Sequence, residues 1–460
     1  MANQSPASAD NSSEITRYLA EWTHDWSTDD VDPDVRQAAR HCLLDWMGVT
    51  LGGIDDESAY IARAEVLEQG GADHATIVGT PYRTGIMNAA LANGTAGHAL
   101  DFDDVHDWLT GHPTVVSMTA LLALAEREGF SGRHLIDAFI VAVEVACRVG
   151  RYVAPSHYAT GWHATATVGA IGAAAGAARA VGLDADGIAR AMGLAASQAG
   201  GLKSMFGTMC KPLHAGKAAS NALLAVQLAR RGFSARTDIL ECEQGFNAAF
   251  SGGGNSDLAL DGLGRPRAVR DVLFKYHAAC FGTHAAMDAI AQVRDAQHVS
   301  TDEVERVELH VPESNLAMCN IPEPQTGLEA KFSMRFTAAM SFAGVPTGDA
   351  DIYNEQTCTR EDLVALRDRV SVNGDSDLGK FEAEAVVHLR NGVVHRAHAD
   401  AGIPESDLAR QERRLSEKFI LLAVPVLGEM RAAKLAELSL GADSGVSVEA
   451  VMRAAVPDTV

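Results

Sequence analysis

The chain has 460 residues and carries 38 lysines and arginines against 60 aspartates and glutamates, a formal net charge of −22, and 47% of its residues are hydrophobic. This composition is typical of a globular protein of two or three domains and excludes a disordered or fibrous chain. The acidic balance argues against nucleic acids and anionic membrane surfaces as partners, because both bind basic faces.

Helix signals dominate the first 265 residues. Asp32 is a capping residue followed by proline, and Ser131 and Asp184 cap two further helices. Glycines mark where several of these helices stop. The signals predict helices over 33–52, from Ser131 onward, from Asp184 to near Gly200, and from Pro212 to Arg231.

One predicted helix is unusually rich in small residues. Gly169, Gly172 and Gly176 are spaced three and four apart, with alanines between and after them. Small residues on one stripe let helix backbones approach closely. We therefore expect a tightly packed, buried helical bundle.

The pattern changes after about residue 265. Residues 304–311 alternate apolar and polar, as a half-buried strand does. Runs at 381–389 and 393–399 flank Asn391-Gly392, which is a strong hairpin signal. We predict a mainly α protein, with an all-helical domain (1–270 and 406–460) and an inserted, smaller α+β lid domain (271–405).

Several features bear on the compartment. The seven cysteines are scattered without a C-x-x-C pair, which indicates free thiols in a reducing compartment. Residues 1–13 are polar, so we expect no signal peptide. The longest apolar run, 419–427, is too short to span a bilayer. We expect a cytoplasmic location.

Polar side chains gather first between residues 97 and 112, which hold four aspartates and three histidines. The segment could bind a divalent cation, or could serve acid/base catalysis, with His112 titrating near neutral pH and Asp101 orienting it. The structural alternative is a solvated acidic loop that caps the helix starting near Pro113. No specific metal motif is present.

His163 and a group of lysines form two further candidates. His163 precedes the glycine-rich helix, where the helix dipole favours a neutral imidazole. Lysine occurs only eight times in the chain, yet Lys203, Lys211 and Lys217 fall within fifteen positions. Lys211 lies beside a predicted helix N-terminus and suits a substrate carboxylate. The structural alternatives are a capping histidine and a surface turn.

Six ordered segments resemble the MmgE/PrpD family. They are N-G-T-A-G-H-A-L-D-F-D-D (93–104), G-H-P (111–113), G-W-H (161–163), M-C-K-P-L-H-A-G-K-A-A (209–219), F-K-Y-H-A-A-C (274–280) and E-A-K-F-S (329–333). The resemblance implies a large helical domain with a smaller lid, a homodimer, and no metal or organic cofactor. The family includes 2-methylcitrate dehydratases, cis-aconitate decarboxylases and an iminodisuccinate epimerase.

The resemblance also implies site residues. Asp101, His112, His163, Lys211 and Lys275 fall at positions that line the family's cleft, and we expect them to be catalytic. We also expect Lys203, His106 and Phe336 to contact substrate. Val105 stands where the decarboxylases and dehydratases have threonine, and Phe336 stands where the decarboxylases have tyrosine.

The expected reaction is proton removal from a carbon next to a carboxylate. Lysines would neutralise the charge that develops, and an imidazole would take the proton. We predict a cofactor-independent lyase of the dehydratase type acting on a small di- or tricarboxylic hydroxy acid. Epimerisation of a dicarboxylate, decarboxylation of the cis-aconitate type, and carboxylate binding without catalysis are the alternatives.

Overall fold

The computed structural model describes residues 14–27, 29, 31–265 and 267–458. The first thirteen residues, for which we expect no signal peptide, lie outside that part. Contacts between Cα atoms divide the chain into two compact units. The helical unit comprises the residues up to 99, 103–272 and those from 407 on, and the mixed unit comprises 100–102 and 273–406. The predicted mainly α class is confirmed.

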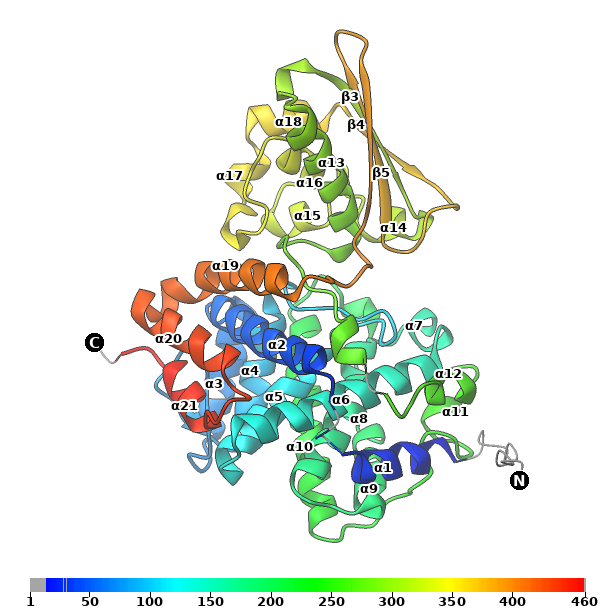
Figure 1. Cartoon of the computed structure of the whole chain (residues 1–460), viewed down its shortest axis with the longest axis vertical. Helices are drawn as coiled ribbons and strands as arrows, with labels where there is room; N and C mark the ends of the chain where they lie inside the picture. Colours follow the sequence, from blue (N-terminus) through cyan, green and yellow to red (C-terminus); the bar gives the residue numbers. More distant parts are fainter. Residues whose placement is uncertain (1–13, 28, 30, 266, 459–460) are drawn as a thin grey trace, which may run out of the picture. The chain divides into compact units, whose positions relative to one another are not determined.

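The helical unit is built mainly from long helices (Figure 1). Its larger helices are α1 (Ile15–Asp25), α2 (Pro33–Gly52), α3 (Glu57–Gln69), α4 (Ile86–Ala99), α5 (Pro113–Glu128), α6 (Gly132–Val153), α8 (Ala164–Ala180), α9 (Ala185–Ala196), α10 (Cys210–Arg230), α19 (Leu408–Leu427) and α20 (Glu429–Leu440). Its smaller elements are α7 (Ser156–Thr160), α11 (Phe246–Phe250), α12 (Ser256–Leu260), α21 (Val448–Ala454), β1 (Ala75–Thr76), β2 (Arg83–Thr84) and the 3₁₀ turns η3 (Lys203–Met205) and η4 (Ala268–Asp271).

The capping residues act as their sequence context predicts. The Asp32 carboxylate accepts the Asp34 N–H at 3.0 Å, and the Ser131 hydroxyl accepts the His134 N–H at 3.2 Å. Two predicted helix ends were wrong by a few residues. The helix after Asp184 ends at Ala196, before the glycines, and α10 begins at Cys210. Pro212 still fits there, because N–H groups in a first turn have no helical acceptor.

Small residues set the helix spacing, as predicted. A Cβ atom on Gly172 of α8 would lie 2.5 Å from the Ala142 carbonyl oxygen of α6. A Cβ on Gly94 of α4 would lie 2.6 Å from the Cα of Gly216 in α10. Real Cβ atoms do not approach other atoms so closely, so both helix pairs depend on glycine. The second pair matters for the site, because α4 carries His98 and α10 carries Lys211.

The mixed unit packs helices against a four-stranded sheet (Figure 1). The strands are β3 (Val304–Val311), β4 (Val370–Gly374), β5 (Glu382–Leu389) and β6 (Val394–Asp400). Its helices are α13 (His284–Gln297), α14 (Glu313–Met318), α15 (Gly327–Lys331), α16 (Met334–Phe342), α17 (Glu355–Cys358) and α18 (Glu361–Arg367), with the 3₁₀ turns η5 (Phe281–Thr283), η6 (Thr301–Glu303) and η7 (Ala350–Ile352).

The sheet order is β4-β3-β5-β6, with β3 and β4 parallel and the other neighbours antiparallel. Strand β3 has the predicted bounds, and the hairpin turns at Asn391-Gly392, where Gly392 has φ 87°. The alternating residues Val307 and Leu309 are buried in the core under α13 and α16. Across the described residues, no helix is both long and apolar enough to cross a membrane.

Candidate active site

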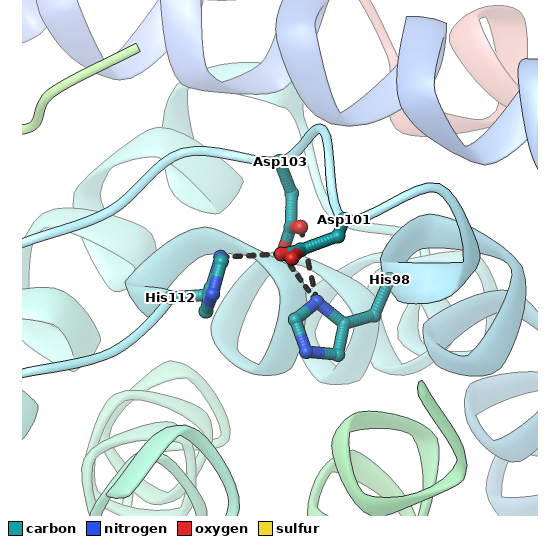
Figure 2. Close-up of side chains that lie close together, drawn as sticks. All are labelled: His98, Asp101, Asp103 and His112. Atoms are coloured by element: carbon teal, nitrogen blue, oxygen red, sulfur yellow. Dashed lines mark hydrogen bonds and ion pairs between the residues drawn. The ribbon is translucent and has the colours of Figure 1, made fainter. Parts of the chain in front are cut away.

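Two histidines in the helical unit share one buried carboxylate (Figure 2). His98 lies in the last turn of α4, Asp103 lies in the following loop, and His112 is the N-cap residue of α5. His98 Nδ1 lies 3.0 and 2.9 Å from the two oxygens of Asp103. His112 Nδ1 lies 3.2 Å from Asp103 Oδ2. A single carboxylate therefore orients two imidazoles.

His163 extends this group to what we call the imidazole cluster, defined as His98, Asp103, His112 and His163. The His163 ring stacks on the His98 ring with centroids 5.7 Å apart, and the His98 and His112 rings meet edge to face at 4.5 Å. His163 is the N-cap residue of α8, as the sequence predicts. Its Nδ1 lies 3.2 Å from Nδ1 of His214 in α10.

The electrostatics of the cluster favour neutral imidazoles around a charged carboxylate. Burial lowers the pKa of His98 to about 4, although the neighbouring Asp103 opposes the shift. Burial also lowers the pKa of His163 well below its ordinary value, and His98 and Lys211 add to the effect. Burial alone would raise the pKa of Asp103, but His112 and His98 outweigh it and hold that pKa well below its ordinary value. Neutral imidazoles can accept protons at neutral pH.

Lys211 supplies a positive charge to the same region. It lies in the first turn of α10, half-buried, and its charge acts on both His98 and His163. Its ammonium lies 5.5 Å from the ring centroid of Phe206, which meets the His163 ring edge to face. The Gly94–Gly216 contact between α4 and α10 holds His98 and Lys211 within electrostatic range of each other.

The loop before α5 has its own supports. The Asp104 carboxyl accepts the backbone N–H and the hydroxyl group of Thr114 in the first turn of α5. Asp104 therefore caps the helix as the structural alternative predicts, but it is buried, so the prediction of a solvated loop was wrong for this residue. Burial, followed by the nearby Asp45, raises the pKa of Asp104 to about 8. Gly111 is required for space, because a Cβ there would lie 2.7 Å from Thr165 Oγ1.

His106 and Lys203, both expected to contact substrate, bond to the main chain. His106 Nε2 donates to the Ala268 carbonyl at 3.0 Å, and His106 Nδ1 accepts the Trp108 N–H at 3.1 Å. Lys203 donates to the Tyr158 carbonyl at 3.0 Å, and its ammonium lies 3.6 Å from the Tyr158 ring centroid. These contacts assign an architectural role to His106, whose two ring nitrogens are both engaged. We call His106 with its two main-chain partners the loop anchor.

The mixed unit holds the remaining expected residues. Lys275 is 1% exposed and donates to Asp101 Oδ1 at 2.8 Å and to the Asp101 carbonyl at 2.5 Å. Asp101 has φ 51°, in the left-handed region. Phe336 lies in α16 and is fully buried. The Asp101 carboxylate pairs with Lys275 within this unit. Its predicted role of orienting His112 stays a prediction.

His98, Asp103 and His112 also offer the donor types that divalent cations bind, and one ligand atom from each lies within 4.8 Å of the others. The distances from His98 Nδ1 to Asp103, 3.0 and 2.9 Å, are ordinary hydrogen-bond lengths, so a proton on that imidazole accounts for this contact. The contact between His112 and Asp103 is an ion pair when His112 is protonated. Cofactor independence stays a prediction.

Three members of the site were missed as functional residues in the sequence. His98 and Asp103 were seen only as part of a polar segment, and His214 was seen only within the lysine-rich segment. The spacing of five residues between His98 and Asp103 follows no helical or strand period, so their contact depends on the turn that follows α4. His214 is one turn beyond Lys211 on α10, which was the available signal.

Comparisons with known proteins match both halves of the chain. Residues 17–259 match the MmgE/PrpD N-terminal domain, and residues 277–443 match the MmgE/PrpD C-terminal domain. The chain belongs to the MmgE/PrpD family. The resemblance seen in the sequence is thereby confirmed.

Curated relatives in this family include cis-aconitate decarboxylases. The human enzyme is 29% identical over 88% of this chain and 87% of its own length, and the mouse enzyme is 30% identical over 84% and 82%. The enzyme of Aspergillus terreus is 25% identical over 96% of both chains. Decarboxylases are lyases, so the comparisons support a lyase-type function for this family member.

Proposed function

We propose that this protein is a cofactor-independent lyase of the dehydratase type, acting on a small di- or tricarboxylic hydroxy acid. The observation that carries the proposal is the imidazole cluster, in which burial keeps His98 and His163 neutral beside Asp103 while Lys211 supplies a nearby positive charge. Neutral imidazoles serve as general bases, and a fixed cation stabilises the carbanion-like charge next to a carboxylate.

In the proposed reaction, the imidazole of either His112 or His163 removes the proton from the carbon next to a substrate carboxylate. The electron pair of that C–H bond forms the carbon–carbon double bond, and the C–O bond breaks with its pair going to oxygen. The departing hydroxide takes a proton from the other imidazole, which enters the reaction as the imidazolium, and leaves as water. His112 suits this acid role because Asp103 can stabilise its imidazolium, whereas His163, kept neutral by burial, suits the role of base. The site therefore needs a base, an acid and a cation.

Lys211 would bind the carboxylate on which negative charge develops. This charge is stabilised most where water is excluded, because Coulomb interactions strengthen in a low dielectric. Lys275 stays a predicted second cation, and within its own unit its charge is balanced by Asp101. The homodimer, the lid movement and the cytoplasmic location also stay predictions.

Two other reactions begin with closely related chemistry. Decarboxylation is favoured by the names of the curated relatives, which are cis-aconitate decarboxylases. Epimerisation of a dicarboxylate would use the same proton removal, with return of the proton to the opposite face. A carboxylate-binding protein without catalysis would use the cation alone.

An NMR experiment in D₂O separates these functions. The purified full chain is incubated with citrate, 2-methylcitrate, malate, cis-aconitate and iminodisuccinate, and products are followed by proton and carbon spectra. Formation of an alkene from a hydroxy acid is the expected result. Loss of CO₂ from cis-aconitate would assign decarboxylation instead. Deuterium exchange with inverted configuration and no alkene would assign epimerisation, and thermal stabilisation without exchange or product would assign binding alone.

A further inference from the structure

His98 presents a nitrogen that the fold itself does not use. The residue is 1% exposed, and Nδ1 is occupied by the Asp103 carboxylate. Nε2 is buried and makes no hydrogen bond with any residue that the structure describes. In Figure 2 this nitrogen points away from Asp103. An unpaired buried polar atom is costly, so such atoms usually have a partner in the working molecule.

The chemical state of that nitrogen follows from its neighbours. An ionised carboxylate only accepts hydrogen bonds, so His98 Nδ1 must carry the proton that points to Asp103. A neutral imidazole has a single N–H, which leaves Nε2 as an acceptor with no proton of its own. The lowered pKa of His98 supports the neutral form. The partner of Nε2 must therefore be a donor.

The surroundings of His98 place this acceptor inside the proposed site. Its ring stacks on His163, meets His112 edge to face, and lies within the electrostatic reach of Lys211. A ligand carboxylate bound by Lys211 carries only acceptor oxygens. The donor that reaches Nε2 must then come from another group on the same ligand, and a hydroxyl on a hydroxy acid is such a group.

We propose that His98 Nε2 accepts a hydrogen bond from the hydroxyl group of the substrate, and that Asp103 acts as the positioning residue that holds His98 in the required tautomer. This inference rests on the proposed function and deepens it, because it makes the hydroxyl a recognised feature of the substrate. A site built to pair with a substrate donor rejects analogues that lack it, because the protein group is then left unpaired.

Two pairs of acids test the proposal. Citrate and tricarballylate (propane-1,2,3-tricarboxylate) share three carboxylates and differ by one hydroxyl, and malate and succinate differ in the same way. Because the carboxylate count within each pair is equal, Lys211 contributes similarly to both members. Calorimetry on the wild-type chain should show citrate or malate binding on the order of 10- to 100-fold more tightly than its partner acid.

Two variants then assign the preference to a residue. His98→Phe should bring the affinity ratio of each pair close to one while leaving tricarballylate or succinate binding unchanged. Asp103→Asn should also lower the ratio, because an amide no longer imposes the tautomer. His134→Gln is the matched control. The His134 Nε2 atom bonds the Ala180 carbonyl at 2.9 Å and the ring packs on Phe130, and neither partner belongs to the imidazole cluster. This variant should keep the wild-type ratio.

The outcomes are distinguishable. A wild-type ratio near one, or a high ratio that persists in His98→Phe, would overturn the role of His98 while leaving the proposed function standing. Absence of binding by all four acids to the wild-type chain would overturn the proposed function, and this inference with it. A high wild-type ratio lost in His98→Phe and kept in His134→Gln is the result expected.

Discussion

The imidazole cluster and the loop anchor both contain a buried histidine, but the two histidines differ in their hydrogen bonds. His98 and His106 are both buried, and burial lowers the pKa of each to about 4. In the loop anchor, both ring nitrogens of His106 bond to the main chain. In the cluster, only Nδ1 of His98 is engaged within the described chain, by the side chain of Asp103.

The difference teaches that burial and a shifted pKa do not by themselves identify a functional histidine. Both residues have those properties. They differ in the number of ring nitrogens that are hydrogen-bonded within the described chain, which is two for His106 and one for His98. An imidazole whose two nitrogens are both hydrogen-bonded to the main chain supports the loop. An imidazole with one nitrogen that makes no hydrogen bond within the described chain can accept a hydrogen bond from a ligand. Variants in the two regions should therefore affect different measurable quantities.

The largest effect is expected from His163→Ala in the cluster. Losing an acid/base group should lower kcat by a factor of about 10² to 10⁴. The side chain makes no capping hydrogen bond to α8, so the helix should persist. Because the ring is 1% exposed, its removal leaves a cavity and should lower the melting temperature without unfolding the chain. Steady-state kinetics with the acid identified in D₂O, together with circular dichroism, provide the measurement. Wild-type turnover in a folded variant would remove His163 from the mechanism.

His106→Gln in the loop anchor should show the opposite pattern. Glutamine cannot keep both main-chain bonds at the imidazole geometry, so the free energy of unfolding should fall by about 1–3 kcal/mol. Turnover per folded molecule should stay close to wild type. Urea denaturation followed by kinetics at low temperature compares the two quantities. A selective rise in KM with unchanged stability would instead support the prediction that His106 contacts substrate.

A smaller effect is expected from pH, through Asp104. Its pKa is about 8 in the folded chain and near 3.8 in an unfolded one, so the folded state binds the proton more tightly and stability declines as pH rises between these values. Buried histidines such as His98 and His106 act in the opposite direction, because their lowered folded pKa values add stability as the unfolded histidines lose protons above pH 6.5. The Asp104 contribution is therefore a difference: relative to a variant without this proton, the wild type should lose roughly 1–2 kcal/mol of stability between pH 6.5 and 8.

Asp104→Asn supplies the control for that measurement. The amide can still accept the Thr114 N–H but has no proton to lose in this range. The stability of both proteins is measured by urea denaturation at several pH values, and the wild-type curve should fall relative to the Asp104→Asn curve between pH 6.5 and 8. Parallel curves for the two proteins would show that Asp104 is already ionised at neutral pH.

Local signals predicted much of the fold. Asp32 and Ser131 cap the helices that follow them, because a short polar side chain can reach the first free N–H groups. Strand β3 follows the alternation of residues 304–311, and Asn391-Gly392 turns the hairpin. Each of these features depends on residues within a few positions. The helix end at Ala196 was misjudged, since two glycines further on were read as its stop.

The site was less predictable because its contacts are not local. The sequence indicated that an aspartate orients His112, but it could not show that Asp101 pairs with Lys275 while Asp103 meets His112. Both aspartates lie in one short loop, and the turn at Asp101 decides where each carboxylate points. The unused nitrogen of His98 is a property of packing, which no residue pattern displays.

The carboxylate shared by His98 and His112 also couples the protonation of the two imidazoles. Two imidazolium ions on either side of one Asp103 would repel each other in a buried site, so gaining a proton on one ring disfavours a proton on the other. When His112 collects a proton during turnover, His98 is thereby kept uncharged. In the proposed reaction, the ring that recognises the hydroxyl group therefore remains a hydrogen-bond acceptor until that group departs.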